Sequence, residues 1–301
     1  MKKRIWIAAG IAVAAAGIAR AEVLEITGEF AAPNREASLL HSISIDRMSG
    51  QDGPALGRAI EQGLNGTHFE LLGGRTGRDA AEGSLSGGVT SGVDESSYTR
   101  TEKKCTTKDD KGKCTKEENV EVRCRKRVIN VNVDLRMVRN SDGRIVYSAS
   151  KPWRNESSWC GNERPSATVE DMIAGAVRDL GYSVRGDIAP RVETYKIRVR
   201  ESDKGMSKDQ GKRFKDLVKL TKRDARGACT GWAAMRAELP GHPSLLFNLG
   251  LCAEQSGKYE EALALYQDAA RAGAREGEEG YGRVQQLIAG REDARERARR
   301  N

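Results

Sequence analysis

Apolar and polar residues alternate along several stretches of the first two thirds of the chain. The longest alternation covers residues 129–137, where Ile129, Val131, Val133, Leu135 and Met137 occupy every second position. A period of two is typical of a strand with one buried face. Asn140-Ser141-Asp142-Gly143 then predicts a hairpin turn into a second strand over residues 145–148. Shorter strands are expected over residues 42–46, 69–72, 81–93 and 195–199.

Two segments of the same region have helical spacing instead. Pro54 stands where a first helical residue belongs, and Leu56, Ile60 and Leu64 follow at every fourth position. The second segment covers residues 168–180, with Thr168 and Asp171 as a variant of the capping box. This order of strands and helices predicts an α+β or α/β domain with a mixed sheet over residues 22–201, closed by Pro190 and a last strand.

The only long apolar run is at the N-terminus and has the order of a secretory signal peptide. Lys2, Lys3 and Arg4 precede the apolar residues 5–18, and Ala19-Arg20-Ala21 has the A-x-A cleavage pattern. The run is shorter than the roughly 20 residues that span a membrane, so a retained anchor is the weaker alternative. We expect cleavage after Ala21, a periplasmic location and, because no cysteine follows the cleavage point, no lipid anchor.

Composition and charge narrow the class of protein further. With 31% charged and 38% hydrophobic residues, the chain has the make-up of a globular protein. Its net charge of +8 falls to +4 without the four basic residues of the leader. Basic clusters remain in residues 100–127 and in the C-terminal tail. Export and only 5% aromatic residues argue against nucleic acid as a partner. The basic clusters are then expected to be a solvated face or to meet an anionic envelope surface, of lipid or polysaccharide, or an acidic partner.

Six cysteines remain after the leader, namely Cys105, Cys114, Cys124, Cys160, Cys229 and Cys252. An even number in an exported chain favours disulfides, because an oxidising compartment preserves them. No close pair of the CxxC type occurs and the three histidines are scattered, so we expect no metal site. Six cysteines allow fifteen pairings, and among these we expect Cys105 with Cys114 and Cys124 with Cys160.

The order of elements over residues 39–190 resembles the α/β domain shared by the curli-secretion lipoprotein and the outer-membrane activators of penicillin-binding proteins. The resemblance depends on the order of a strand that ends near Asp46, a helix, a second strand, a long strand and a helix that ends before Pro190. The segments within this order are Gly53-Pro54-Ala55-Leu56-Gly57 at the start of the first helix, Phe69-Glu70-Leu71-Leu72, Glu82-Gly83-Ser84-Leu85-Ser86-Gly87, and Asp142-Gly143-Arg144-Ile145-Val146-Tyr147-Ser148. This chain differs from those families in lacking a lipobox and in its charged, cysteine-rich insert at residues 93–127. A curled, strand-rich domain unrelated to them is the alternative.

The C-terminal part resembles a tetratricopeptide repeat. His242-Pro243-Ser244-Leu245-Leu246-Phe247-Asn248-Leu249-Gly250 begins one helix, Gly257-Lys258-Tyr259 turns the chain, and residues 260–269 begin the second helix. The residues that fall at the positions of that family are Leu246, Leu249, Gly250, Gly257, Tyr259, Ala262, Tyr266 and Ala269, with Trp232 as the counterpart of Tyr266 in a degenerate preceding repeat. We therefore expect an all-α repeat stack over residues 212–301, after a linker at 202–211.

The resemblance also implies a pairing and a binding role. Adjacent repeats place Cys229 and Cys252 on neighbouring helices, so we expect a third disulfide between them. In this family an asparagine at the position of Asn248 often holds a ligand backbone, with Lys219 and Lys222 as further candidates to bind a partner. The alternative is that Asn248 only serves local packing.

The hypothesis that the chain is an enzyme has little support in the sequence. Gly73-Gly74-Arg75-Thr76-Gly77 lacks the Gly-Lys-Ser/Thr ending of a phosphate-binding loop, and no Gly-x-Ser-x-Gly elbow occurs. We therefore expect an exported, noncatalytic adaptor or scaffold that binds a protein partner in the envelope and needs no cofactor. The alternatives are an envelope-polymer hydrolase and a subunit of a secretion apparatus.

Overall fold

The structure is a computed structural model that describes residues 22–73, 77 and 80–300. The predicted leader and Gly74, Arg75 and Thr76 of the glycine-rich turn lie outside these residues. The chain divides into two compact units, each built from two separate stretches. The helical unit contains residues 22–27 and 194–285, and the sheet unit contains residues 28–193 and 286–300. The predicted linker at 202–211 lies inside the helical unit, and residues 286–300, predicted with the repeats, belong to the sheet unit.

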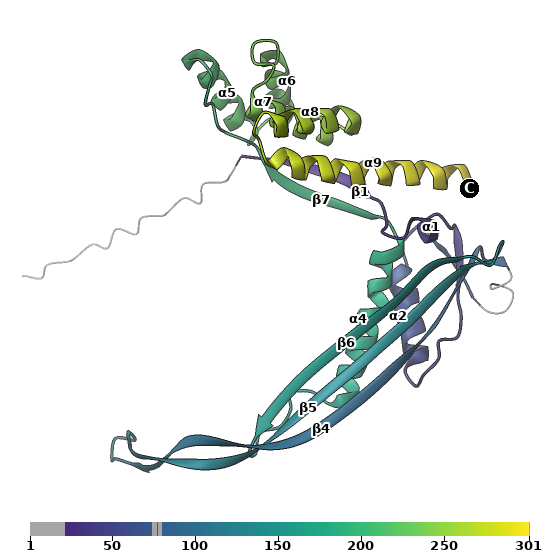
Figure 1. Cartoon of the computed structure of the whole chain (residues 1–301), viewed down its shortest axis with the longest axis vertical. Helices are drawn as coiled ribbons and strands as arrows, with labels where there is room; N and C mark the ends of the chain where they lie inside the picture. Colours follow the sequence, from purple (N-terminus) through teal and green to yellow (C-terminus); the bar gives the residue numbers. More distant parts are fainter. Residues whose placement is uncertain (1–21, 74–76, 78–79, 301) are drawn as a thin grey trace, which may run out of the picture. The chain divides into compact units, whose positions relative to one another are not determined.

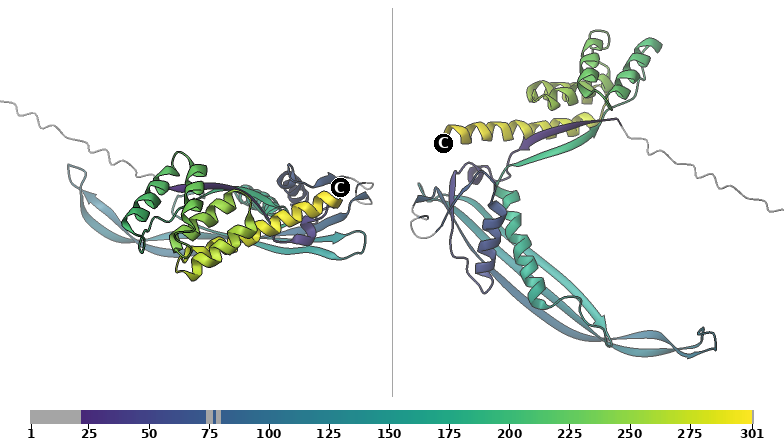
Figure 2. Two further views of the ribbon diagram at one scale, coloured as in Figure 1. Left: turned by 90° about the horizontal axis from the view of Figure 1, so that it is seen from above. Right: turned by 180° about the vertical axis from the view of Figure 1, so that it is seen from behind.

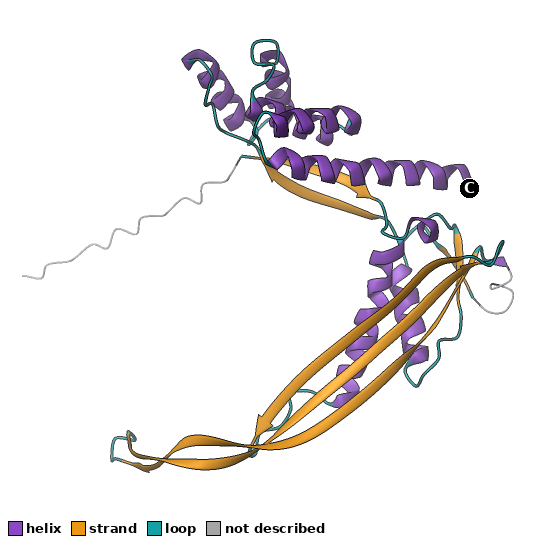
Figure 3. Ribbon diagram, viewed as in Figure 1, coloured by secondary structure: helices purple, strands orange, loops and turns teal. Residues whose placement is uncertain are grey.

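The sheet unit contains a five-stranded mixed sheet in the order β3-β2-β4-β5-β6. β2 (Ser42–Ile45) is parallel to its neighbours β3 (Glu70–Leu72) and β4 (Gly83–Lys108). β4 is antiparallel to β5 (Cys114–Arg139), which is antiparallel to β6 (Ile145–Cys160) (Figures 1 and 3). The predicted mixed sheet is therefore confirmed.

Helices α2 (Gly53–Leu64) and α4 (Val169–Ile188) lie on the same side of this sheet (Figure 2). Both bury an apolar face against it, as the helical spacing predicted, and a short helix, α1 (Arg35–Ser38), precedes β2. Gly181 allows α2 and α4 to approach closely, because a Cβ atom there would lie 2.6 Å from the Cβ of Ala59. The side chain of Thr168 caps α4 by accepting from the backbone N–H of Asp171.

The alternation in β5 decides which face of the sheet forms the core. Ile129, Val131, Val133, Leu135 and Met137 are at most 3% exposed and pack with α2 and α4. The intervening polar residues 130, 132, 134 and 136 lie on the opposite, more exposed face. The predicted strand is confirmed, but it is the inner part of a much longer one.

β4 and β5 form a long hairpin that extends past the end of β6 (Figure 1). β6 pairs with β5 only as far as Cys160 opposite Cys124, so residues 99–123 form a two-stranded arm beyond that point. Almost all side chains of the arm are exposed on both faces. The predicted insert at 93–127 is thus a continuation of two sheet strands.

All three expected disulfides are confirmed. Cys105–Cys114 closes the tip of the arm, and Cys124–Cys160 joins β5 to the end of β6. Cys229–Cys252 joins two helices of the helical unit. The described chain has no free cysteine.

The helical unit consists of paired helices and part of a two-stranded sheet. The helices are α5 (Lys208–Leu220), α6 (Ala225–Met235), α7 (Pro243–Gln255), α8 (Tyr259–Arg271) and the first part of α9 (Glu276–Arg300). The sheet joins β1 (Val23–Phe30) to β7 (Arg191–Arg198). Three contacts in antiparallel register connect them, namely Thr27 to Thr194, Glu25 to Lys196, and Glu22 to Val199.

α7 is the central helix of this unit, since residues 244–254 are all buried. At Gly250 a Cβ atom would lie 2.7 Å from the ring of Tyr266, so glycine is needed where α7 and α8 cross. Gly257 has a φ of 72° in the turn between these helices. Trp232, Ala262, Tyr266 and Ala269 are 0% exposed, as the predicted packing positions require.

Candidate binding site

Asn248, the predicted ligand-binding residue, binds the backbone of this chain itself. The N–H of Arg200 donates to Oδ1 of Asn248 over 2.8 Å, and Nδ2 of Asn248 donates to the carbonyl oxygen of Arg200 over 2.9 Å. The side chain thereby pairs with both backbone groups of one residue, which is the way an amide reads a peptide backbone. Because Asn248 is 0% exposed, it is not open to a second ligand in this conformation.

Residues 199–204, called here the groove segment, lie along α7 and are held at more than one point. Val199 is 2% exposed, and Nε2 of His242 lies 3.1 Å from the carbonyl oxygen of Lys204. The guanidinium of Arg200 pairs with Glu276. A hollow of about 430 Å³ remains beside the segment, lined by residues 198–202, Phe247 and Glu276.

Glu254, at the other end of α7, is a buried carboxylate with four donors. Nε and Nη2 of Arg283 donate to it over 2.6 and 2.8 Å, and the hydroxyls of Tyr195 and Tyr266 donate over 2.6 and 2.5 Å. Burial and the hydrogen bond to Glu254 raise the pKa of Tyr195, and burial and the charge of Glu254 raise that of Tyr266. Although burial lowers the pKa of Arg283, its hydrogen bonds to Glu254 outweigh that effect and raise it. The cluster therefore joins α7 to α8, to the first part of α9 and to β7, and it stabilises the unit.

The two lysines predicted beside Asn248 lie elsewhere on the helical unit. Nζ of Lys219 is 4.0 Å from Asp216 on the same helix, and the side chain is 72% exposed. Nζ of Lys222 is 2.9 Å from Glu22, at the start of the described chain. Among the described contacts, none joins either lysine to Asn248.

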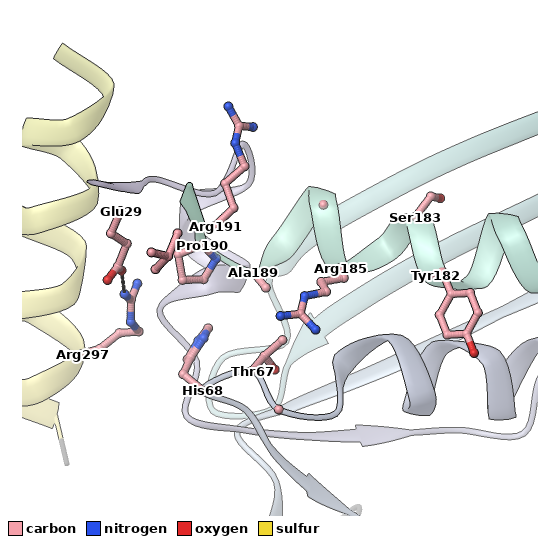
Figure 4. Close-up of a pocket in the computed structure, with 13 residues that line it drawn as sticks. Glu29, Thr67, His68, Tyr182, Ser183, Arg185, Ala189, Pro190, Arg191 and Arg297 are labelled. Atoms are coloured by element: carbon pink, nitrogen blue, oxygen red, sulfur yellow. Dashed lines mark hydrogen bonds and ion pairs between the residues drawn. The ribbon is translucent and has the colours of Figure 1, made fainter. Parts of the chain in front are cut away.

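A hollow of about 670 Å³ in the sheet unit lies between the end of α2, the end of α4 and the last turns of α9 (Figure 4). The acidic, basic and histidine side chains that line it are Glu29, His68, Arg185, Arg191 and Arg297. Arg297 pairs with Glu29 over 2.6 Å, and Arg185 donates to the carbonyl oxygens of Gly63 and Asn65. Arg191 points away from His68, stacks over Phe30 and pairs with Glu193.

His68 is the group of this hollow with the largest change in acidity. Burial, with a contribution from the charge of Arg297, lowers its pKa to about 4. The imidazole is therefore neutral at pH 7, and Nε2 lies 2.9 Å from the carbonyl oxygen of Ser38. With each arginine partnered inside the unit and the histidine uncharged, these side chains hold the last turns of α9 and the end of α2 in place.

Sequence reasoning missed the partners of Asn248 and Glu254. Arg200, Arg283 and Tyr195 are distant from α7 in the chain and belong to segments with no motif of their own. The one available signal was Glu254 itself, a charged residue at an apolar position of the helix pattern. Such a residue indicates a buried ion pair without naming its partner.

The described residues contain no group of three or more histidine, cysteine, aspartate or glutamate side chains arranged to hold a metal ion. None of their helices is both long enough and apolar enough to cross a membrane.

Comparison with known proteins gives limited similarity. No family model matches the chain, and no curated protein matches it. Among solved structures, the PelC dodecamer from Paraburkholderia phytofirmans matches 56% of this chain and 100% of its own, at 14% identity and a TM-score of 0.28. A minor lipoprotein from Acinetobacter baumannii matches 50% of this chain and 96% of its own, at 8% identity and a TM-score of 0.24. A lipoprotein from Caulobacter crescentus matches 51% and 84%, at 11% identity and a TM-score of 0.19. Similarities this low carry no conclusion about function.

Proposed function

We propose that this chain is an exported, noncatalytic adaptor of the cell envelope that binds a protein partner through its helical unit. The observation that carries this proposal is the presence of three disulfides spread over both units. Disulfides form and persist in oxidising compartments such as the periplasm and are rare in the cytosol. They agree with the leader pattern at residues 1–21, whose cleavage after Ala21 is part of the proposal.

The arrangement of the helices supports an adaptor. We propose that α5 to α8 are two tetratricopeptide-type helix pairs joined by Cys229–Cys252, with the first part of α9 as a cap. Such stacks bury their faces only against neighbouring repeats and present the remaining surface to partners. Because the groove segment already occupies Asn248, the partner would bind the exposed surface of α5, where Lys219 lies.

The chemistry of the hollows supports a noncatalytic role. In the hollow of about 670 Å³, Glu29 and Arg297 pair with each other, and Arg185 donates to backbone carbonyl oxygens. The buried carboxylate of Glu254 is saturated by four donors. A general acid or base needs a free proton-carrying group with a pKa near the working pH. His68, with a pKa of about 4, does not meet that need as a base that exchanges protons near neutrality.

The test is photo-crosslinking in the native cells. A photoreactive amino acid at Lys219 is expected to give an adduct with a second protein. The same amino acid at Arg271, which is also exposed and lies on the last turn of α8, is the matched control. The uncrosslinked protein from the same cells is weighed by mass spectrometry before and after reduction. Its mass is expected to match a chain that begins at Glu22, with no free thiol until reduction.

Adducts only between copies of this chain, or adducts of equal yield at Lys219 and Arg271, would contradict the partner surface on α5. Free thiols before reduction would contradict the compartment.

A further inference from the structure

A row of arginines lies on β5 where the arm meets the three-stranded part of the sheet. Arg123, Arg125 and Arg127 occupy alternate positions of β5 and line one hollow of about 500 Å³. Alternate residues of a strand point to the same face and are spaced by about 7 Å. This is the face on which Ile129 to Met137 form the core, so the row begins where the cover of α2 and α4 ends.

An aromatic side chain, that of Trp159, lies beside the arginine row. Trp159 on β6 is directly opposite Arg125, and the guanidinium of Arg127 lies 5.0 Å from the centre of the indole ring. The Cys124–Cys160 disulfide joins the residues that follow Arg123 and Trp159, and it points to the other face of the sheet. The bridge therefore fixes the register of both strands without covering the arginines, which is how a preformed binding surface is held.

The charges on this face are unbalanced within the unit. Arg127 pairs with Glu95 over 2.6 Å, whereas the described contacts include no ion pair for Arg123, Arg125 or Arg164. Glu163 is the one acidic residue that lines the hollow. On the opposite face, by contrast, Lys126 and Arg154 both pair with Glu156. Glu121, two positions before Arg123, shares its face of β5. Arg123, Arg125 and Arg164 thus have carboxylates near them but no direct ion pair among the described residues, and such a local excess of positive charge favours the binding of an anion.

The shape of the surroundings selects an extended chain over a flat surface. Residues 161–165 leave β6 at one side of the hollow, and α4 begins shortly after them. Because α2 and α4 pack on the rest of this face, the exposed part is one stretch of strand bordered by residues 161–165. A single extended chain fits such a narrow strip better than a flat surface does.

We propose that the face formed by Arg123, Arg125, Arg164 and Trp159 binds an extended acidic peptide segment of a partner protein, with Arg127 held beside it by Glu95 and Trp159. An extended peptide repeats its side chains at the same spacing as β5, so acidic residues at every second position match Arg123 and Arg125. Arginine forks bind carboxylates through paired hydrogen bonds. The side chains that lie between the acids face outward. This surface belongs to the sheet unit and does not depend on the proposed partner of the helical unit.

The test uses the purified, oxidised protein and fluorescently labelled ten-residue peptides, with binding measured by anisotropy in about 50 mM salt. One peptide alternates glutamate with serine, and its isomer places five glutamates before five serines. The alternating peptide is expected to bind at least about tenfold more tightly than the isomer, because only it matches the row. Replacing both Arg123→Glu and Arg125→Glu is expected to weaken its binding by about tenfold or more.

The matched control carries Arg136→Glu, on the opposite face of β5, with Arg178→Glu on α4. It changes the net charge equally at exposed positions of the same unit. Unchanged unfolding temperatures show that both double variants fold. Equal affinity for the two isomers, or equal weakening in the control, would overturn the proposal by showing a general charge effect. Binding of polygalacturonate or of anionic phospholipid vesicles without binding of the alternating peptide would also overturn it, in favour of another class of anion.

Discussion

Asn248 binds one residue of its own chain with a geometry that usually serves to hold a ligand. Its amide satisfies the N–H and the carbonyl oxygen of Arg200, two backbone groups that would otherwise be left without partners beside a buried helix. The family resemblance predicted this residue as a contact point and left open whether its role was local. The structure places the contact 48 residues away along the chain, which no short-range pattern could indicate.

Replacing Asn248 by alanine should reduce the free energy of unfolding by about 2 to 4 kcal/mol, because it leaves a buried donor and a buried acceptor unpaired. Urea unfolding followed by circular dichroism measures this change. Asn162→Ala, at an exposed asparagine, should change stability by no more than about 0.5 kcal/mol. Similar small effects for both variants would mean that water replaces the amide without cost.

The lowered pKa of His68 predicts that the stability of the folded protein depends on pH. Its pKa is about 4 in the folded protein because the ring is buried, with a smaller contribution from Arg297, and 6.5 is its ordinary value. The unfolded chain therefore binds a proton at higher pH than the folded chain does. The stabilising contribution is fully present above pH 6.5 and is lost as the pH falls from 6.5 toward 4.

Urea unfolding at about pH 7 and at about pH 4.5 measures this effect. Between these two pH values, the wild-type protein should lose about 2 kcal/mol more unfolding free energy than the His68→Gln variant does. His41→Gln, at a histidine whose side chain is 46% exposed, is the control and should behave as the wild type does. If His68→Gln leaves the pH dependence unchanged, the pKa of the ring is the same in the folded and unfolded chains, and the ring is not shielded from water.

Among the elements, those that bury one face could be predicted and the arm could not. The strand at residues 129–137 and the helices at 53–64 and 169–188 show their periods because one side of each is apolar. The arm is exposed on both faces, so its strands have no apolar period to detect, and the sequence indicated only a charged, cysteine-rich insert there. The disulfide pairs followed from proximity in sequence and from the repeat spacing, while the hollows and the arginine row needed the strand register.

Two glycines of α4 offer a direct comparison of packing and propensity. Gly181→Ala should destabilise the sheet unit by about 1 to 3 kcal/mol, because its Cβ would lie 2.6 Å from the Cβ of Ala59. Gly186→Ala should stabilise it by up to about 1 kcal/mol, because nothing lies within 4 Å of the added methyl and alanine favours the helix. Thermal unfolding of both variants checks the signs, and a shift of both in one direction would refute the close α2–α4 contact.

The two disulfides of the sheet unit should differ in importance. Removing Cys124–Cys160, which spans a separation of 36 residues, should cost about 3 to 4 kcal/mol of unfolding free energy. Removing Cys105–Cys114 should leave global unfolding almost unchanged, because it closes the tip of an exposed arm that can open by itself. The expected effect of that second change is faster proteolysis within residues 99–123. Equal losses of global stability would mean that the arm unfolds only with the rest of the unit.

For the molecule as a whole, the division into two units predicts two unfolding transitions. Each unit has its own buried residues and its own disulfides, so calorimetry should resolve two heat-absorption peaks. Asn248→Ala should shift only the transition of the helical unit, and Gly181→Ala only that of the sheet unit. A single transition moved by both variants would show that the units unfold together.

The interleaving of the two units has a consequence for the order in which the chain can fold. Residues 22–27 of the helical unit pair with β7, whose residues follow only after nearly the whole sheet unit. The sheet unit in turn needs residues 286–300, where Asp293 pairs with Arg35 and Arg297 pairs with Glu29. A chain that crosses a membrane from its N-terminus therefore completes neither unit until its last helix has emerged. During that interval the first strand and the cysteines of the hairpin remain open to chaperones and to oxidising enzymes.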